Sequence, residues 1–295
     1  MNKMVCFGEV LWDVFPTHDK IGGAPLNVAI RLKSLGNNVS VISRVGTDEK
    51  GNKILDLFKE KDVNIEGVQI DQQYKTGKVK VMLNEKGSAS YDIMYPRAWD
   101  KIELTEAAKS ITKQSDTFIF GSLVARDNIS RNTLFELLKL AHYKIFDVNL
   151  RPPYYTMEVL KKLMNQADFI KFNDDEIFEI AEELNSNQKS LEQTILFIAK
   201  ETNTKTICVT KGRHGAILYY NETFYHNSGY KIQVVDTVGA GDSFLASIVN
   251  QLSKNIHPQE ALNFACAVGA IVASSEGANP IIKTEVINNM MSSTL

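Results

Sequence analysis

The residues best suited to chemistry lie late in the chain, in the run Asp236-Thr-Val-Gly-Ala-Gly-Asp242. Glycines let backbone N–H groups converge in conformations that other residues resist. With the positive end of a following helix, such donors form an anion site, and a phosphate is its natural occupant. A carboxylate beside that site would repel the phosphate unless it accepts a proton from an attacking hydroxyl. The run therefore predicts phosphoryl transfer, with Asp242 as a base that the helix N-terminus keeps ionised.

A simpler interpretation is that Asp242 only caps a helix and that the glycines only make a tight turn. The run is not a dinucleotide-binding fingerprint, because Phe244 takes the place of the third glycine. It is not a Walker loop either, because no Gly-Lys-Ser or Gly-Lys-Thr follows. A lone glycine triplet is weak evidence, so the catalytic interpretation needs other motifs beside it.

A second group of polar residues lies near the N-terminus. The pair Gly22-Gly23 lets the backbone approach a ligand, and Asn27 offers both a donor and an acceptor near a helix start. Asp13 is expected to end the first strand, where α/β folds bind ligands. These groups suit the neighbouring hydroxyls of a sugar. A helix cap at Asn27 and a solvated turn at Asp13 are equally good explanations at this point.

Three further positions follow expected strands. Arg151 offers a fork of donors for a phosphate or carboxylate, or else a surface salt bridge before a proline stop. Asn173 and Glu176 lie three residues apart, which suits Mg²⁺ held largely through water, although a capped helix with an acidic first turn is the simpler interpretation. The run from Thr210 to Ala216 is, by itself, only a hairpin turn.

The elements that must position these residues follow an α/β rhythm, which predicts a parallel sheet covered by helices. Strands are expected over residues 5–14, 39–45, 117–120, 143–148, 169–172 and 205–210, with a hairpin over 216–226. Helices are expected over 26–35, 51–61, 128–141, 156–166, 175–184, 190–201, 240–252 and 258–274. Between residues 65 and 95 the rhythm breaks into alternating strands around turn residues 84–88, which predicts a hairpin. That hairpin is either a lid or an edge extension of the main sheet.

Composition narrows the class of protein. The 295 residues are 44% hydrophobic, which is ample for a sizeable core, and the net charge of −2 gives no basic surface for nucleic acid or for an anionic membrane. Cys6, Cys208 and Cys266 are expected to be buried, reduced thiols, because their spacing fits no zinc site. Acidic residues interrupt the N-terminus early and no membrane span is evident, so a cytoplasmic protein is expected.

Taken together, these motifs resemble the ribokinase-like (PfkB) family of carbohydrate kinases. Asp-Thr-x-Gly-Ala-Gly-Asp-Ser-Phe resembles the family's C-terminal signature. Gly-Glu-Val-Leu-Trp-Asp-Val-Phe-Pro and Gly-Gly-Ala-Pro-Leu-Asn-Val-Ala are most similar to its fructokinase branch. The resemblance runs in order from residue 9 to 280. It implies one ribokinase-like α/β domain over residues 1–295: a central, mostly parallel sheet flanked by helices, with a small β-sheet lid at about 65–97 plus part of 14–22.

The resemblance also implies a role for each motif. Asp242 is the catalytic base, and the backbone of Gly239, Ala240 and Gly241 is the anion hole. The residues implied to bind the sugar or its phosphate are Asp13, Gly23, Asn27, Arg97 and Arg151. The residues implied to bind ATP are Asn173, Thr210, Gly212, Gly215, Gly277 and Ala278. Glu176 is implied to hold Mg²⁺ through water, and Asp236 to lie beside a monovalent-cation site. Around Arg97, which follows the hairpin, the sequence differs from that of most fructokinases.

The activity implied is ATP-dependent phosphorylation of D-fructose to fructose 6-phosphate, with ATP and Mg²⁺, and K⁺ at the cation site. A ribokinase, a 2-keto-3-deoxygluconate kinase and a nucleoside kinase of the same family remain alternatives. In a different class, the chain would be a sugar sensor that had lost catalysis, but the intact Asp242 and glycine run argue against this. Lids of this family often pair between subunits, which makes a homodimer an expectation.

Overall fold

The computed structural model describes residues 1–83 and 89–292, so the turn expected at residues 84–88 lies outside the described residues. The chain divides into two compact units, Met1–His142 and Tyr143–Leu295. The expectation of one domain over the whole chain stays a prediction.

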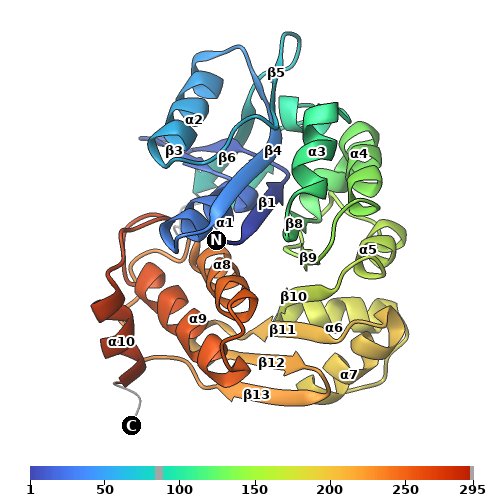
Figure 1. Cartoon of the computed structure of the whole chain (residues 1–295), viewed down its shortest axis with the longest axis vertical. Helices are drawn as coiled ribbons and strands as arrows, with labels where there is room; N and C mark the ends of the chain where they lie inside the picture. Colours follow the sequence, from blue (N-terminus) through green and yellow to red (C-terminus); the bar gives the residue numbers. More distant parts are fainter. Residues whose placement is uncertain (84–88, 293–295) are drawn as a thin grey trace. The chain divides into compact units, whose positions relative to one another are not determined.

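The first unit contains a parallel sheet with the strand order β8-β1-β4-β5 (Figure 1). Its strands are β1 (Lys3–Phe7), β4 (Asn38–Gly46), β5 (Val68–Asp71) and β8 (Thr117–Gly121). Cys6 in β1 pairs with Val41 on one side and with Ile119 on the other, and all three side chains are buried. A parallel strand that is buried on both faces of the sheet consists of a continuous run of apolar residues, which is why these strands could be recognised in the sequence.

The helices of the first unit are α1 (Ala24–Ser34), α2 (Glu49–Glu60), α3 (Glu106–Lys113) and α4 (Asn128–Leu138), with two short 3₁₀ helices, η1 (Ala98–Lys101) and η2 (Leu123–Arg126). α1 packs against the sheet, while α3 and α4 lie side by side on its opposite face (Figure 1). Gly36, just beyond α1, has φ +86°, the left-handed conformation expected of a glycine that follows a helix.

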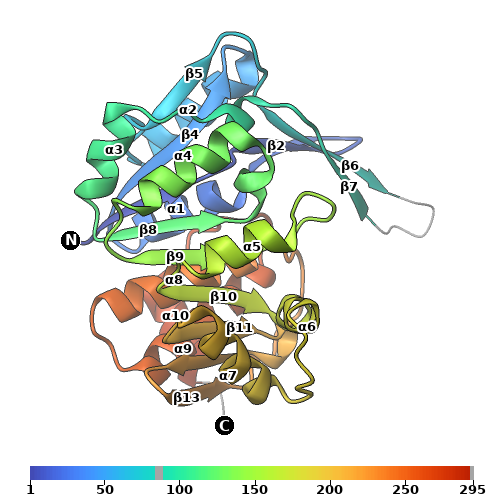
Figure 2. The same ribbon diagram turned by 90° about the vertical axis from the view of Figure 1, so that its right-hand side faces the viewer.

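A second, smaller sheet in the first unit has the order β3-β2-β6-β7. Its strands are β2 (Leu11–Val14), β3 (Asp19–Gly22), β6 (Gly77–Leu83) and β7 (Ala89–Ile93). Figure 2 shows β6 and β7 extending away from the rest of the unit. We call this four-stranded sheet the small sheet. The interpretation of the hairpin as an edge extension of the main sheet is therefore wrong.

Two sequence-based boundaries also need correction. The strand expected over 5–14 is two strands in different sheets, because the backbone turns at Gly8, which has φ +146°. The expected lid, at about 65–97, begins too early, because β5 pairs in parallel with β4, with Val45 opposite Ile70. The helix α3 was not expected, whereas β3 lies in the part of residues 14–22 that the resemblance assigned to the small β-sheet.

The second unit has a sheet of order β13-β12-β11-β10-β9. Its strands are β9 (Lys144–Asp147), β10 (Phe169–Asn173), β11 (Thr206–Thr210), β12 (Ala216–Tyr220) and β13 (Thr223–Asn227). β9, β10 and β11 run parallel, and β12 and β13 form the antiparallel hairpin that the sequence predicted. Strands β9 and β10 end at the positions where the sequence places its polar motifs.

Helices cover both faces of this second sheet, with α6 and α7 on one face and α8 and α9 on the other (Figure 2). The helices are α5 (Met157–Met164), α6 (Asp174–Glu183), α7 (Leu191–Thr202), α8 (Ala240–Ser253), α9 (Pro258–Ala273) and α10 (Thr284–Ser292). Apart from α10, each was predicted to within a few residues. The α/β class with mostly parallel sheets and a small additional sheet is confirmed.

The three cysteines are free and buried, as expected. Burial raises the pKa of the Cys266 thiol to about 12, so this thiol stays protonated at neutral pH. None of the helices described here has the length and apolar character needed to cross a membrane.

Candidate active site

The N-terminus of α8 has the geometry expected of an anion site. Gly239 is the N-cap with φ +76°, and a Cβ built on it would lie 2.5 Å from the Cβ of Ala278, so only glycine fits there. A Cβ on Gly241 would meet only the Nζ of Lys171, at 3.8 Å. The backbone of the first turn is thus packed on one side and open at Gly241. Asp242 lies in this first turn and is half-buried.

A buried lysine lies beneath this turn. The Nζ of Lys171 in β10 lies 2.8 Å from Oδ1 of Asp147, the last residue of β9, and both side chains are at most 8% exposed. Burial opposes the charged form, but the negative charges of Asp147, Glu176 and Asp242 outweigh it and raise the pKa of Lys171 above its usual value. The ammonium therefore stays charged next to the open backbone of Gly241.

Lys171 belongs to none of the motifs recognised in the sequence. The sequence feature that could have identified it is a lysine inside the apolar strand expected over residues 169–172. A fully buried lysine almost always has a charged partner, so such a lysine indicates a buried ion pair. Asp147 would have been the matching signal at the end of the neighbouring strand. Its Oδ2 is buried and has no hydrogen-bond partner among residues 1–83 and 89–292. This leaves one buried carboxylate oxygen available to a ligand.

Asn173 and Glu176 form a reciprocal cap at the start of α6. Asn173 Oδ1 accepts from the Glu176 N–H, and Glu176 Oε2 accepts from the Asn173 N–H, each at 2.8 Å. The other oxygen, Oε1, accepts from the Leu150 N–H at 2.8 Å. Burial raises the pKa of Glu176, and the charge of Lys171 opposes this rise. The capped-helix interpretation is confirmed, and the metal-binding role of Glu176 stays a prediction.

Arg151, beside this cap, is exposed. Its Nη1 donates to the carbonyl oxygen of Leu150 at 2.8 Å, and no carboxylate pairs with it in the described part of the chain. The surface salt bridge considered from the sequence is therefore not formed with the residues described. The guanidinium remains available to an anion.

Asp236 joins two loops next to the N-terminus of α8. Its Oδ1 accepts from the Val238 N–H at 3.0 Å, and its Oδ2 accepts from the Gly277 N–H at 3.4 Å. Gly277 has φ +75°, and a Cβ on it would meet nothing within 4 Å. The carboxylate therefore holds the 236–239 loop against the loop that carries Gly277 and Ala278.

The turn between β11 and β12 is built from predicted nucleotide-binding residues. The Lys211 N–H donates to the Gly215 carbonyl at 2.7 Å and closes the turn. Gly215 has φ +77° and is packed against the Asn227 carbonyl, whereas Gly212 has φ +52° with open space around it. Thr210 ends β11 and is half-buried. The hairpin turn is confirmed, with an open backbone at Gly212.

In the first unit, the predicted sugar-binding residues lie around the start of α1. Gly23 is the N-cap of α1, with φ +109°, and Asn27 lies in the turn that follows, 4% exposed. Asn27 is therefore not the cap. Asp13 lies within β2 of the small sheet and is half-buried, so it neither ends the first strand nor stands in a solvated turn. A Cβ on Gly22 would lie 2.5 Å from Asp13 Oδ2, so this glycine makes room for the carboxylate.

Arg97 follows β7 at the edge of the small sheet. One of its terminal nitrogens contacts the Sδ of Met94 at 2.9 Å, and a thioether is a weak acceptor. Its Nε is buried and lacks a hydrogen-bond partner within the described part of the chain. The guanidinium thus has no strong acceptor among residues 1–83 and 89–292, which is consistent with a residue that meets an anionic ligand.

No group of three or more His, Cys, Asp and Glu side chains within the described residues has the arrangement of a metal site. Asp147, Glu176 and Asp242 all act on the charge of one cation, the ammonium of Lys171. A magnesium ion held mainly by water and by phosphate oxygens fits these residues better than one enclosed by protein ligands.

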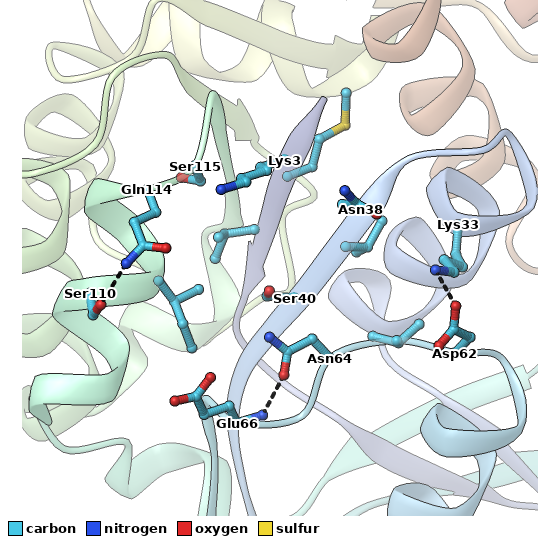
Figure 3. A pocket seen from close by; sticks show the side chains of 15 residues that line it. Lys3, Lys33, Asn38, Ser40, Asp62, Asn64, Glu66, Ser110, Gln114 and Ser115 are labelled. Atoms are coloured by element: carbon cyan, nitrogen blue, oxygen red, sulfur yellow. Dashed lines mark hydrogen bonds and ion pairs between the residues drawn. The ribbon is translucent and has the colours of Figure 1, made fainter. Parts of the chain in front are cut away.

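A pocket of about 550 Å³ in the first unit lies elsewhere. Figure 3 shows Lys3, Asn38, Ser40, Asn64 and Gln114 around it, at the amino ends of β1 and β4. None of the predicted site residues lines it, and ligands of α/β folds bind at the carboxyl ends of strands. This pocket is therefore not the candidate active site.

The fold and the glycine-rich helix start define a phosphoryl-transferring α/β enzyme. The chain belongs to the pfkB family of carbohydrate kinases, whose family model matches residues 1–285. It is therefore a sugar kinase, a phosphotransferase with an alcohol acceptor.

Curated relatives and solved structures agree with this assignment. The chain is 29% identical to "Probable fructokinase-7" of Arabidopsis thaliana, over 99% of this chain and 93% of the relative. It is 28% identical to "Fructokinase-2" of Oryza sativa, over 97% of this chain and 92% of that relative. Among solved structures, an uncharacterized sugar kinase from Pyrococcus horikoshii has a TM-score of 0.84 at 25% identity, covering 98% of this chain and 100% of that one. A fructokinase with bound ATP from Xylella fastidiosa has a TM-score of 0.87 at 22% identity, with 98% of each chain covered, and shows the same fold.

Proposed function

We propose that this kinase transfers the γ-phosphoryl group of ATP to D-fructose and gives fructose 6-phosphate and ADP. Full-length similarity to proteins named fructokinase supports the sugar, and the N-terminus of α8 supports the chemistry. The observation that carries the proposal is the placement of Asp242 one residue beyond the open backbone of Gly241, with a buried ammonium next to it.

In the proposed transfer, Asp242, the backbone at the start of α8 and Lys171 each have a separate role. The oxygen of the sugar hydroxyl attacks the γ-phosphorus, and the bond from that phosphorus to the bridging oxygen of ADP breaks. Asp242 takes the hydroxyl proton, an assistance typically worth roughly 10²–10⁴-fold in rate. The N–H groups of Gly239 and Gly241 would bind the transferred group, and Lys171 would add a positive charge. The Ala240 N–H donates to the Thr237 carbonyl at 3.2 Å, so it would have to leave that bond to join the anion hole.

Residues of the first unit would hold the sugar. The half-buried carboxylate of Asp13 and the buried amide of Asn27 match neighbouring hydroxyls, and half-buried Gly23 would contribute its backbone. Arg97, which has no strong acceptor among the described residues, would meet the phosphate end of the ligand. Arg151, in the second unit, would also bind the phosphate. These assignments complete the substrate side of the proposal.

Residues of the second unit would hold the nucleotide. Asn173, Thr210, Gly212, Gly215, Gly277 and Ala278 line the turns and loops proposed to contact ATP. Glu176 and the free Oδ2 of Asp147 would hold Mg²⁺ through water. The ion, when bound, would offset charge on the phosphates. Asp236 would lie beside a K⁺ ion, and a homodimer formed through the small sheet also belongs to the proposal.

A coupled ADP-release assay tests the choice of sugar. Purified enzyme with ATP and Mg²⁺ is offered fructose, ribose, 2-keto-3-deoxygluconate and adenosine at matched concentrations. We expect the highest kcat/KM with fructose. Turnover of another acceptor without turnover of fructose would contradict the proposed substrate but keep the kinase. Absence of turnover with every acceptor, while sugar still binds in calorimetry, would favour the sugar sensor.

A further inference from the structure

We infer that Arg126 is a positioning residue for the transfer reaction, because its guanidinium fixes the row of the small sheet that carries Asp13. The inference rests on the proposed role of Asp13 in binding the sugar. Arg126 ends η2, the 3₁₀ helix that follows β8, and belongs to no predicted motif. Its side chain is only 3% exposed.

The guanidinium of Arg126 bridges two segments. Nε and Nη2 donate to the two oxygens of Asp100, at 2.7 and 3.0 Å, in a bidentate pair whose carboxylate is fully buried. The terminal nitrogens also donate to the carbonyl oxygens of Ile93 and Met94, at 3.2 and 2.8 Å. β7 ends at Ile93, so Arg126 binds the point where this strand leaves the small sheet.

Strand register connects this point to the predicted sugar ligand. Ile93 in β7 pairs with Val79 in β6, and Val79 pairs with Asp13 in β2. The carbonyl that Arg126 holds therefore lies in the same row as Asp13, two strands away. Ile93 and Val79 are both buried, so a shift of Ile93 is passed to Val79 by close packing.

The same ion pair also fixes the segment that carries Arg97. Asp100 Oδ2 accepts from the Arg97 N–H at 2.7 Å, in addition to the bond from Arg126. The guanidinium of Arg126 lies 4.1 Å from the ring centre of Trp99 and 5.2 Å from that of Tyr95, within cation–π range. One side chain thus holds the end of β7, two strands from Asp13, and also the carboxylate that accepts from the Arg97 N–H.

The stability of the fold alone does not require a buried pair of Arg126 and Asp100. A buried ion pair is often no more stabilising than apolar residues of the same volume, because removing two charges from water is costly. The planar fork of arginine fixes direction, however, since four hydrogen bonds must be met at once. Lysine keeps the charge but not the fork, so the two substitutions separate charge from geometry.

The test compares Arg126→Gln and Arg126→Lys with the wild type and with Ile198→Ala. Ile198 is fully buried in α7 of the second unit, and the matched variant loses stability without touching the small sheet. Kinetics are measured with whichever sugar the wild type phosphorylates, so a wrong choice of fructose does not affect the comparison. We expect Arg126→Gln to raise the KM for sugar at least tenfold while the KM for ATP changes less than twofold. Arg126→Lys should recover part of the loss.

Hydrogen exchange on the free protein provides a second readout that does not depend on turnover. Arg126→Gln should speed amide exchange in β2, β6 and β7 at least tenfold and leave β10 and β11 unchanged. Equal rises in the KM for sugar and for ATP, matching those of Ile198→Ala, would overturn the inference. Unchanged exchange in the small sheet would overturn it as well, even if the wild type were inactive with every sugar.

Discussion

The Nζ of Lys171 lies 2.8 Å from Oδ1 of Asp147, and this buried pair lies beneath the first turn of α8. It brings a fixed positive charge to within 3.8 Å of the place where a side chain of Gly241 would begin. A charge held in a site that excludes water acts far more strongly on a developing negative charge than it would in water. The pair therefore links the core of the second unit to the proposed chemistry.

Removing the charge of Lys171 should slow the reaction. We expect Lys171→Met to lower kcat about 10²-fold, as is typical when one stabilising group is lost. The single variant also leaves buried carboxylates without their cation, which costs about 3–5 kcal/mol of stability. The double variant Lys171→Met/Asp147→Asn should recover much of that stability without recovering kcat.

Chemical denaturation and steady-state kinetics on both variants check this prediction. Lys139→Gln, which breaks an exposed pair with Glu136, is the control and should change neither quantity appreciably. Recovery of kcat together with stability in the double variant would show that Lys171 acts only on the fold.

The two glycines of the α8 turn should respond differently to the same substitution. Gly239→Ala meets both a positive φ and the side chain of Ala278, so we expect a loss of about 1–3 kcal/mol in stability and a fall in activity. Gly241→Ala has room for its methyl group, so its stability should stay within about 1 kcal/mol of the wild type. That methyl group lies where the phosphoryl group is proposed to bind, so kcat should still fall.

Thermal melts and kinetics on the glycine pair separate the two effects. Full activity in Gly241→Ala would place the transferred phosphoryl group elsewhere. Unchanged stability in Gly239→Ala would show that the turn adjusts to a side chain.

Neither Lys171 nor Arg126 could be recognised as a candidate from the sequence, although most of the strands and helices could be. Apolar strands such as Met4–Phe7 are visible because burial on both faces requires a continuous run of apolar residues. Motif residues such as Asp242 are visible because their order along the chain is distinctive. The partners of a buried charge are not visible in this way, since Asp147 and Lys171 lie 24 residues apart and meet only through strand pairing.

Asp127 should make the first unit sensitive to acid. Its Oδ2 accepts from Lys101 Nζ at 2.6 Å and from the Tyr95 hydroxyl at 2.8 Å, and its Oδ1 caps α4. Burial opposes ionisation, but these hydrogen bonds and the charge of Lys101 hold the pKa of Asp127 below its usual value. A lowered pKa in the folded state stabilises the protein above the unfolded pKa of about 3.9, and this stability is lost as pH falls through the folded value.

Asp127→Asn tests this directly, because asparagine still caps a helix but carries no charge. We expect the variant to unfold about 1 kcal/mol more easily at pH 7, and the difference to shrink as the pH is lowered from 5 to 3. Urea unfolding across that range measures both values. A difference that stays constant with pH would mean that the charge of Asp127 does not stabilise the fold.

The central claim is that Asp242 takes the proton of the sugar hydroxyl, and Asp242→Asn tests it most directly. The amide keeps the size of the side chain but cannot accept the proton, so kcat should fall about 10²–10⁴-fold while calorimetry still detects sugar binding with near wild-type affinity. Near wild-type turnover in Asp242→Asn would contradict the account.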